Sequence, residues 1–339
     1  MLKKWLHSRE FTSIAFIIAM FLGVGAINPN FLSASNIFLC LNSSVVYTVV
    51  AVGIALVILT GEIDVSVGAT LGMAATIGGA MIRDGQPWTL AIGVALLVGL
   101  AIGAVNGFGI TVLKVPSIIM TLGINGIIRG LMYVYTNGKW VENIPNEFKR
   151  LSQGRLNLLG LNTFTWFYLG AIALIVVTHL VLTRTKRGRY LAAVGDNADG
   201  SKLLGIPVDG TKFMAFLLCG MLSAVGGVLF VSRVGFVTPI SGNGYEMKVI
   251  AACVLGGISL SGGVGSVIGA GVGAAIMASI SRVLVFVGLS SDYDDTITGI
   301  LLIIIVVADA LIRNRAIEQA RRERLSAKTA HGMKEAAHE

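Results

Sequence analysis

The chain alternates between long apolar blocks and short polar segments. A helix needs about 20 apolar residues to cross a bilayer, and ten blocks approach that length. We therefore predict an all-α, polytopic integral membrane protein with about ten transmembrane helices. Glycine-rich runs inside the blocks leave room for broken or re-entrant segments. The predicted spans are residues 11–27, 37–60, 66–82, 89–113, 117–135, 164–183, 213–232, 245–262, 264–287 and 296–312.

Composition supports a membrane protein and argues against other classes. Hydrophobic residues make up 55% of the chain and charged residues 13%, whereas soluble domains average about 45–50% and about 25%. The 43 glycines suit close helix packing in a bilayer. Because the net charge of +8 lies in loops and tails, we expect no nucleic-acid partner. Cys40, Cys219 and Cys253 lie in apolar runs without metal-ligand spacing, so we expect buried small side chains and no metal site.

Charge also predicts the orientation. Of the 26 Lys and Arg residues, 17 fall in segments that ten spans with an internal amino terminus would leave in the cytoplasm, and five fall in the external loops. Basic loop residues resist translocation, so both termini are predicted to be cytoplasmic. The first apolar block is expected to be an uncleaved span. The predicted organisation is a basic segment 1–10, a transmembrane domain 11–312 and a basic tail 313–339.

One polar segment, Arg184–Lys212, separates two groups of spans. Its basic residues place it in the cytoplasm. A short helix is predicted from Asn197 to Leu204, with Asp196 or Asn197 capping its start and Gly205, ahead of Ile206-Pro207, ending it. Such a helix is well placed to receive a push from a soluble partner. An ordinary solvated connector is the alternative.

The turn between the second and third spans, TGEIDVSVG, carries two carboxylates, Glu62 and Asp64. Carboxylates beside a membrane are expensive unless they are solvated, paired or used. Acid–base chemistry or a cation site is one interpretation, but no metal-spaced histidine accompanies the pair. The structural interpretation is that Asp64 or Ser66 caps the next helix amid glycines.

A second polar island, Ser241–Lys248, precedes the glycine-rich segment 255–269. Glu246 and Lys248 stand at the mouth of a span, where long charged side chains pair or reach toward water. The glycines match no phosphate-binding motif, because GxxxxGK[ST] occurs nowhere in the chain. They are predicted to break or tightly pack helices, and broken helices commonly line transport paths.

Polar side chains recur in the fourth and fifth spans. Asn125 and Arg129 are four residues apart and share one helical face, which should look into the bundle or a water-filled path. Helix–helix hydrogen bonding is the alternative role for each residue. The predicted substrate-path residues are Ser66, Asn106, Thr121 and Asn125.

Three motifs together, TGEIDVSVG, GDNADGSKLLGI and GNGYEMKVIAACVLGGISLSGG, resemble the permeases of bacterial ABC importers for ribose and related sugars. The resemblance covers about residues 10 to 313. The segment Thr136–Pro145 is most similar to the autoinducer-2 import permeases within that family. The resemblance implies a bacterial inner-membrane protein with three kinds of partner: a second permease subunit, identical or related, an ATP-binding subunit that holds ATP and Mg, and a periplasmic solute-binding protein.

The resemblance also implies residue roles. The family's coupling helix falls on Asn197–Ile206, although Gly200-Ser201 stands where the family often has Ala-Ala, so we expect a helix that is short or forms on docking. The expected ATPase-coupling residues are Asp196, Asn197, Ser201, Lys202, Leu203, Leu204, Gly205 and Ile206. The expected structural or gating residues are Gly61, Asp64, Gly68, Gly244, Glu246, Gly256 and Gly257.

The expected function is the path for autoinducer-2 or a similar small polyhydroxylated solute, with no catalytic residue and no cofactor in this chain. A permease for rhamnose or ribose is the first alternative. An ion-coupled secondary transporter is kept open by Glu62 and Asp64. A passive channel or a membrane enzyme would need a repeated filter motif or a nucleophile or metal cluster, and the sequence contains none.

Overall fold

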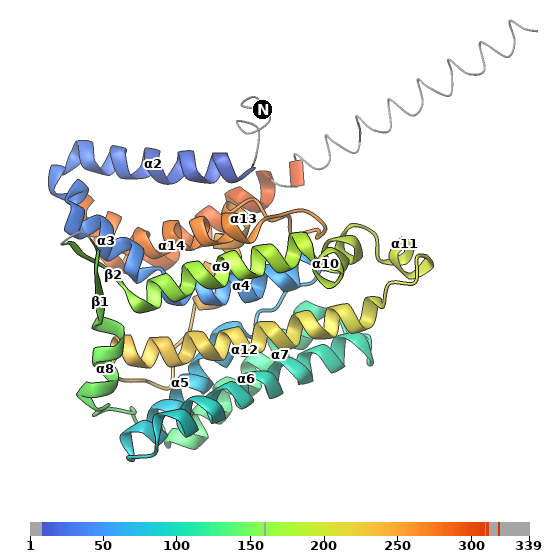
Figure 1. Ribbon diagram of the computed structural model, residues 1–339, viewed down its shortest axis with the longest axis horizontal. Helices are drawn as coiled ribbons and strands as arrows, with labels where there is room; N and C mark the ends of the chain where they lie inside the picture. The colour runs from blue at the N-terminus through green and yellow to red at the C-terminus, as the bar shows by residue number, and fades with distance from the viewer. Residues whose placement is uncertain (1–8, 159–160, 309, 312–317, 319–339) are drawn as a thin grey trace, which may run out of the picture.

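The computed structural model (Figure 1) describes residues 9–158, 161–308, 310–311 and 318. Most of the predicted segment 1–10, and all of the tail 313–339 except residue 318, lie outside the described residues. Most of the long helices lie side by side. The short helices α10 (Lys186–Asp196) and α11 (Ala198–Leu203) lie at one end of this bundle, and α8 (Asn146–Gln153) lies at the other (Figure 1).

Each predicted span contains a helix. Residues 294–308 are helical as well. The remaining elements, in chain order, are α2 (Arg9–Ile27), η1 (Pro29–Leu32), α3 (Ala34–Ser43), α4 (Val45–Leu59), α5 (Val67–Arg83), α6 (Trp88–Thr111), α7 (Ser117–Thr136), β1 (Arg155–Leu158), β2 (Leu161–Thr165), α9 (Trp166–Arg184), α12 (Val208–Val234), α13 (Tyr245–Leu255), α14 (Val267–Val287) and η2 (Ser291–Tyr293).

The helices differ in whether they can cross a membrane alone. Within the described residues, five are long and apolar enough by themselves, namely α6, α7, α9, α12 and α14. The bent pair α3 and α4, which meet at 42°, supplies a sixth span if counted as one. The protein is therefore a multi-pass helical membrane protein. A count of ten spans and the placement of the termini stay predictions.

One expectation needs correction. The predicted span 245–262 is wrong in its second half, because α13 ends at Leu255. Gly257, Gly262 and Gly263 then adopt positive φ angles, which end a helix and form a turn. With 11 residues, α13 spans only about 16 Å, about half of the hydrocarbon core. The predicted all-α class is confirmed, and the one small sheet among the described residues is the antiparallel hairpin of β1 and β2 after α8.

The core forms around α4 and α12. Helix α4 is apolar on all sides and almost every residue in it is buried, as expected for a helix surrounded by others. Helix α12 packs against α4, α5 and α6. The α6–α12 contact is a backbone contact, because a Cβ atom on Gly220 would overlap the carbonyl oxygen of Gly99. Small residues thus let these helices approach closely in the bilayer.

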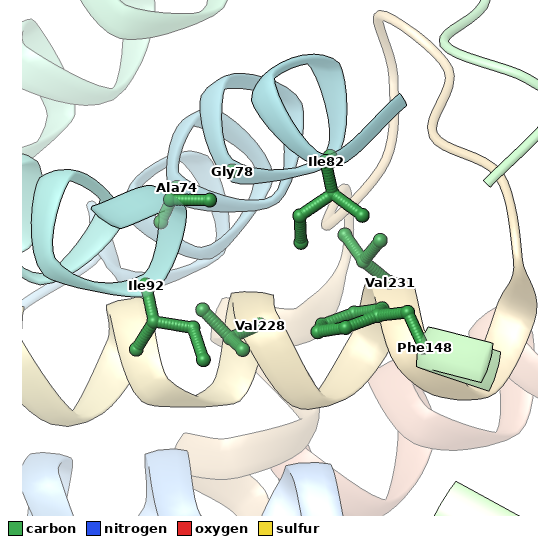
Figure 2. A pocket seen from close by; sticks show the side chains of 9 residues that line it. Ala74, Gly78, Ile82, Ile92, Phe148, Val228 and Val231 are labelled. Carbon is green, nitrogen blue, oxygen red and sulfur yellow. The ribbon is translucent and has the colours of Figure 1, made fainter. Parts of the chain in front are cut away.

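Helix α8 closes the end of the bundle opposite α11. Its one buried side chain, Phe148, enters a small apolar hollow between α5, α6 and α12. Figure 2 shows Ile82, Ile92, Val228 and Val231 converging on this hollow beside the Phe148 ring. The Ser232 hydroxyl also donates to the Phe148 carbonyl oxygen at 2.8 Å. The segment that contains α8 is therefore packed against the end of the bundle.

Candidate functional site

A buried polar cluster forms where the chain runs extended before α5. One carboxylate oxygen of Asp64, Oδ1, accepts hydrogen bonds from the Ser66 amide at 2.8 Å and the Ser66 hydroxyl at 2.6 Å. The Asn106 amide nitrogen donates to that hydroxyl at 2.8 Å. All three side chains are buried. The structure therefore brings together two of the predicted path residues, Ser66 and Asn106, around Asp64.

Asp64, and not Ser66, supplies the hydrogen bond at the start of α5. The carboxylate caps the Ser66 amide, whereas the Ser66 side chain makes no capping bond. This geometry agrees with the structural interpretation of Asp64, because a short acidic side chain accepts from the amide two residues on. Such a buried carboxylate is satisfied by donors within its own turn.

Helix α7 fixes the same extended segment from the other side. The Thr121 hydroxyl accepts a hydrogen bond from the Val65 amide at 3.1 Å, and the Ser117 hydroxyl accepts one from the Ile63 amide at 3.3 Å. Non-helical backbone at membrane depth is tolerated only where its polar groups are satisfied. Ser117 was not among the predicted path residues, although its four-residue spacing from Thr121 places both on one face of α7.

A second set of polar groups lies about two turns beyond Thr121 along α7. The Arg129 guanidinium donates to the Ser241 carbonyl oxygen at 2.7 Å. The Glu246 carboxylate accepts from the Gly244 amide at 3.3 Å through Oε1. The other oxygen, Oε2, lies where a Cβ atom on Gly68 would be. The loop before α13 is therefore held against α7 and the first turn of α5.

Several buried polar atoms in this region have no hydrogen-bond partner within the described residues. They include the side-chain oxygens of Asn106 and Asn125 and Oε2 of Glu246. The structure does not bring the predicted path residue Asn125 into the Asp64 cluster by a hydrogen bond, although Asn125 lies one turn from Thr121 on α7. An unpaired buried polar group costs about 1–3 kcal/mol. Such acceptors suit a water or a solute hydroxyl.

The polar segment 184–212 contains two short helices before α12. The expected polar connector after Arg184 is instead α10, and Asp196 is its last residue, not a cap. Asn197 caps α11 by accepting from the Gly200 amide at 2.8 Å. At the other end, Gly205 has φ of 76°. The Gly205 amide donates to Lys202 and the Ile206 amide donates to Ser201, which are the bonds of a glycine-terminated helix end.

The tip of this segment is apolar and uncovered. Leu203 and Leu204 are 90% and 81% exposed. The other side of α11 is anchored, because the buried Ser201 hydroxyl donates to the Ala193 carbonyl oxygen at 2.9 Å. Helix α11 is therefore already formed and has six residues, which fits the expectation of a short helix.

A backbone contact joins the end of α10 to two non-helical turns, one before α5 and one after α13. The Gly263 amide donates to the Leu59 carbonyl oxygen at 3.1 Å. A Cβ atom on Gly195 would overlap both of these groups, and one on Gly262 would overlap Gly61. We call this meeting of Leu59, Gly61, Gly195, Gly262 and Gly263 the glycine contact. It links the end of α10 to the turn before α5 and to the turn after α13.

Two ion pairs tie the first turn of α12 to the same end of the bundle. Lys212 contacts Glu62 at 2.5 Å, with the two side chains about one-fifth exposed or less. Lys114 contacts Asp209 at 2.7 Å, with both side chains well exposed. Glu62, one of the two carboxylates that suggested ion coupling, is therefore paired.

The remaining expected structural residues lie at helix breaks. Gly244 has φ of 79° immediately before α13, and a Cβ atom on Gly256 would overlap the Gly269 backbone of α14. Gly257 has φ of 86°. The three cysteines are buried free thiols. Among the residues that the structure describes, no group of three His, Cys, Asp or Glu side chains is placed to hold a metal ion.

Comparison with known proteins identifies the class of molecule. A family model described as the permease component of the branched-chain amino acid transport system matches residues 36–306. The autoinducer 2 import system permease protein LsrC of Salmonella typhi is 38% identical over 324 residues, covering 96% of this chain and 92% of that protein. No solved structure matches the chain significantly.

Similar proteins from two further bacteria carry the same name. The protein from Enterobacter sp. (strain 638) is 39% identical over 312 residues, covering 92% of this chain and 90% of that protein. The protein from Escherichia coli (strain K12 / DH10B) is 37% identical over 324 residues, covering 96% and 93%. These matches confirm the resemblance drawn from the three sequence motifs. The chain belongs to the branched-chain amino acid transport system permease family, as a relative of the autoinducer 2 import permeases.

Proposed function

We propose that this chain is the membrane-spanning subunit of an ATP-driven importer in the bacterial inner membrane, and that it carries autoinducer 2 or a similar small polyhydroxylated solute. The observation that carries the proposal is its near-full-length similarity to autoinducer 2 import permeases. A rhamnose or ribose permease is the competing assignment, because the same sequence motifs resemble permeases for such sugars.

Energy must reach this chain from a separate subunit. The sequence holds no GxxxxGK[ST] phosphate loop, so we assign ATP and Mg to a partner ATPase. The exposed leucines at the tip of α11 offer that partner an apolar contact, and burial of such side chains is worth about 1.5–3 kcal/mol each. In this proposal the segment 184–212 and both termini face the cytoplasm.

The glycine contact can transmit a movement of α11 and α10 into the helix bundle. Closure of the ATPase would move α11 and α10, and Gly195 has no free space against Leu59 and Gly263. The movement would therefore pass to the turn before α5 and to the turn after α13. Packed interfaces of this kind switch between discrete arrangements. The path would open alternately toward a periplasmic binding protein and toward the cytoplasm, between this chain and a second permease subunit, identical or related.

The polar cluster is suited to weak recognition of hydroxyl groups. The unpaired oxygens of Asn106 and Asn125 are acceptors, and a polyol donates hydrogen bonds. A small number of such hydrogen bonds suits a transport path, because tight binding would slow the release of the solute. An ion-coupled mechanism is less well supported by this geometry, since Glu62 is paired with Lys212 and Asp64 is bonded to Ser66.

The proposed cargo is tested by uptake into proteoliposomes that hold this chain, its partner permease, the ATPase and the binding protein. We expect uptake of labelled autoinducer 2 that needs ATP on the cytoplasmic side and that excess ribose or rhamnose does not reduce. Competition by either sugar would show that the cargo is a sugar, and the assignment as an ATP-driven importer would still hold. Uptake that follows an ion gradient without ATP would contradict the proposal.

The proposed ATPase contact is tested by replacing both tip leucines, L203S and L204S. Helix α11 should still form, because its cap and its glycine end are untouched. We expect the ATPase to co-purify at a reduced level and ATP-driven uptake to fall. The matched control is L289S, which changes a half-exposed leucine beyond α14. Normal ATPase recovery with the double variant would show that α11 is not the docking element.

The role of Asp64 is tested with two substitutions. Asp64→Ala leaves the Ser66 amide and hydroxyl buried without an acceptor, so we expect a loss of about 1–3 kcal/mol in the free energy of unfolding. Asp64→Asn keeps an oxygen in the same place and should retain folding and ATP-driven uptake. A well-folded Asp64→Asn variant that cannot transport would show that the charge is required, which favours ion coupling.

A further inference from the structure

An apolar groove lies between α9, α10 and α12, away from the polar cluster. Helix α10 packs against both α9 and α12, at the end of the bundle that carries α11 (Figure 1). The groove has a volume of about 610 Å³, within the roughly 300–1,000 Å³ of small-molecule sites. Its walls include Val177 and Val181 of α9 and Met214 and Leu218 of α12.

The walls of the groove are mostly apolar side chains, so an apolar occupant suits them. A lipid acyl chain fits this requirement because it is apolar, narrow and flexible, and the surrounding bilayer supplies it.

The end of the groove beside α10 is basic. Arg187 and Tyr190 both line it, and none of the described residues that line it is acidic. Arg184 and Lys186 are exposed on either side of Thr185, which caps α10 by accepting from the Gly188 amide at 3.0 Å. The first turn of α10, the positive end of its dipole, thus lies beside the arginine. Such a mouth complements an anionic headgroup.

The wall formed by α10 is held in place. A Cβ atom on Gly188 would overlap the Val181 carbonyl oxygen, so α10 turns back tightly against α9. This contact keeps Arg187 at the groove. Arg187 is exposed and forms no ion pair with any described residue, so its guanidinium is free to bind a phosphate.

We propose that this groove binds an anionic phospholipid of the cytoplasmic leaflet. One acyl chain lies between α9 and α12, and the phosphate lies at Arg187 beside the start of α10. The proposal rests on the proposed function only in placing α10 at the cytoplasmic face. Because α10 continues to Gly195 and the glycine contact, a bound lipid would brace the coupling segment against the bundle.

Native mass spectrometry of the full chain, purified with its partners in detergent, tests the site directly. Phosphatidylglycerol and phosphatidylcholine of the same acyl composition are titrated as probes. One basic residue near a membrane surface contributes about 1 kcal/mol to the binding of anionic lipid, or about fivefold in affinity. We expect the wild-type protein to prefer phosphatidylglycerol by about fivefold or more and R187Q to lose that preference.

A second variant tests the acyl-chain part of the site. M214W should fill the groove and reduce the binding of both lipids. The matched controls are K139Q, an exposed lysine after α7, and V134W, an exposed apolar position on α7. Both controls should bind lipid like the wild-type protein.

Two outcomes would overturn the lipid site. Equal binding of the two lipids by the wild-type protein would contradict the proposed selectivity of Arg187 for an anionic headgroup. Loss of permease–permease association in M214W, with lipid binding unchanged, would show that a protein partner covers the groove. Neither readout depends on transport, so a failed cargo assignment would leave this result interpretable.

Discussion

The rest of the structure depends on the glycine contact, where three backbone segments pack directly against one another. Leu59 at the end of α4, Gly195 near the end of α10 and Gly263 after α13 come so close that a Cβ atom on Gly195 has no room. The hydrogen bond from Gly263 to Leu59 fixes this geometry. Interiors packed this closely transmit displacement instead of absorbing it. Helix α10, the turn before α5 and the turn after α13 are therefore in direct backbone contact, and in the proposed function they move together.

Breaking helices inside a membrane carries a cost that the polar cluster offsets. The extended segment before α5 exposes amides that a helix would have satisfied internally. The hydroxyls of Ser117 and Thr121 accept hydrogen bonds from two of these amides, and the Asp64 carboxylate accepts a hydrogen bond from a third. The same polar side chains that make the break possible also make its surroundings hydrophilic. In the proposed function, these residues serve both to stabilise the broken helix and to line the transport path.

Sequence reasoning was strongest where the signal is local. The helix at Asn197 and its glycine end follow from residue types within one turn, and both are present. Polarity inside apolar spans singled out Ser66, Asn106 and Thr121, which the structure places around one segment. The end of α13 was not predicted, because an apolar run that contains glycines has the same composition as a continuous membrane-spanning helix. The glycine contact was missed because nothing in the sequence near Gly195 indicates its distant partners.

The measurement that tests the central claim most directly is the number of solute molecules imported per ATP hydrolysed by Gly195→Ala complexes that still co-purify with the ATPase. The added methyl group must displace the backbone of Leu59 or Gly263. We predict that hydrolysis continues while uptake per ATP falls severalfold. Gly123→Ala on α7, where a Cβ atom meets nothing within 4 Å, should behave like the wild-type protein. An unchanged ratio in Gly195→Ala would contradict coupling through this contact.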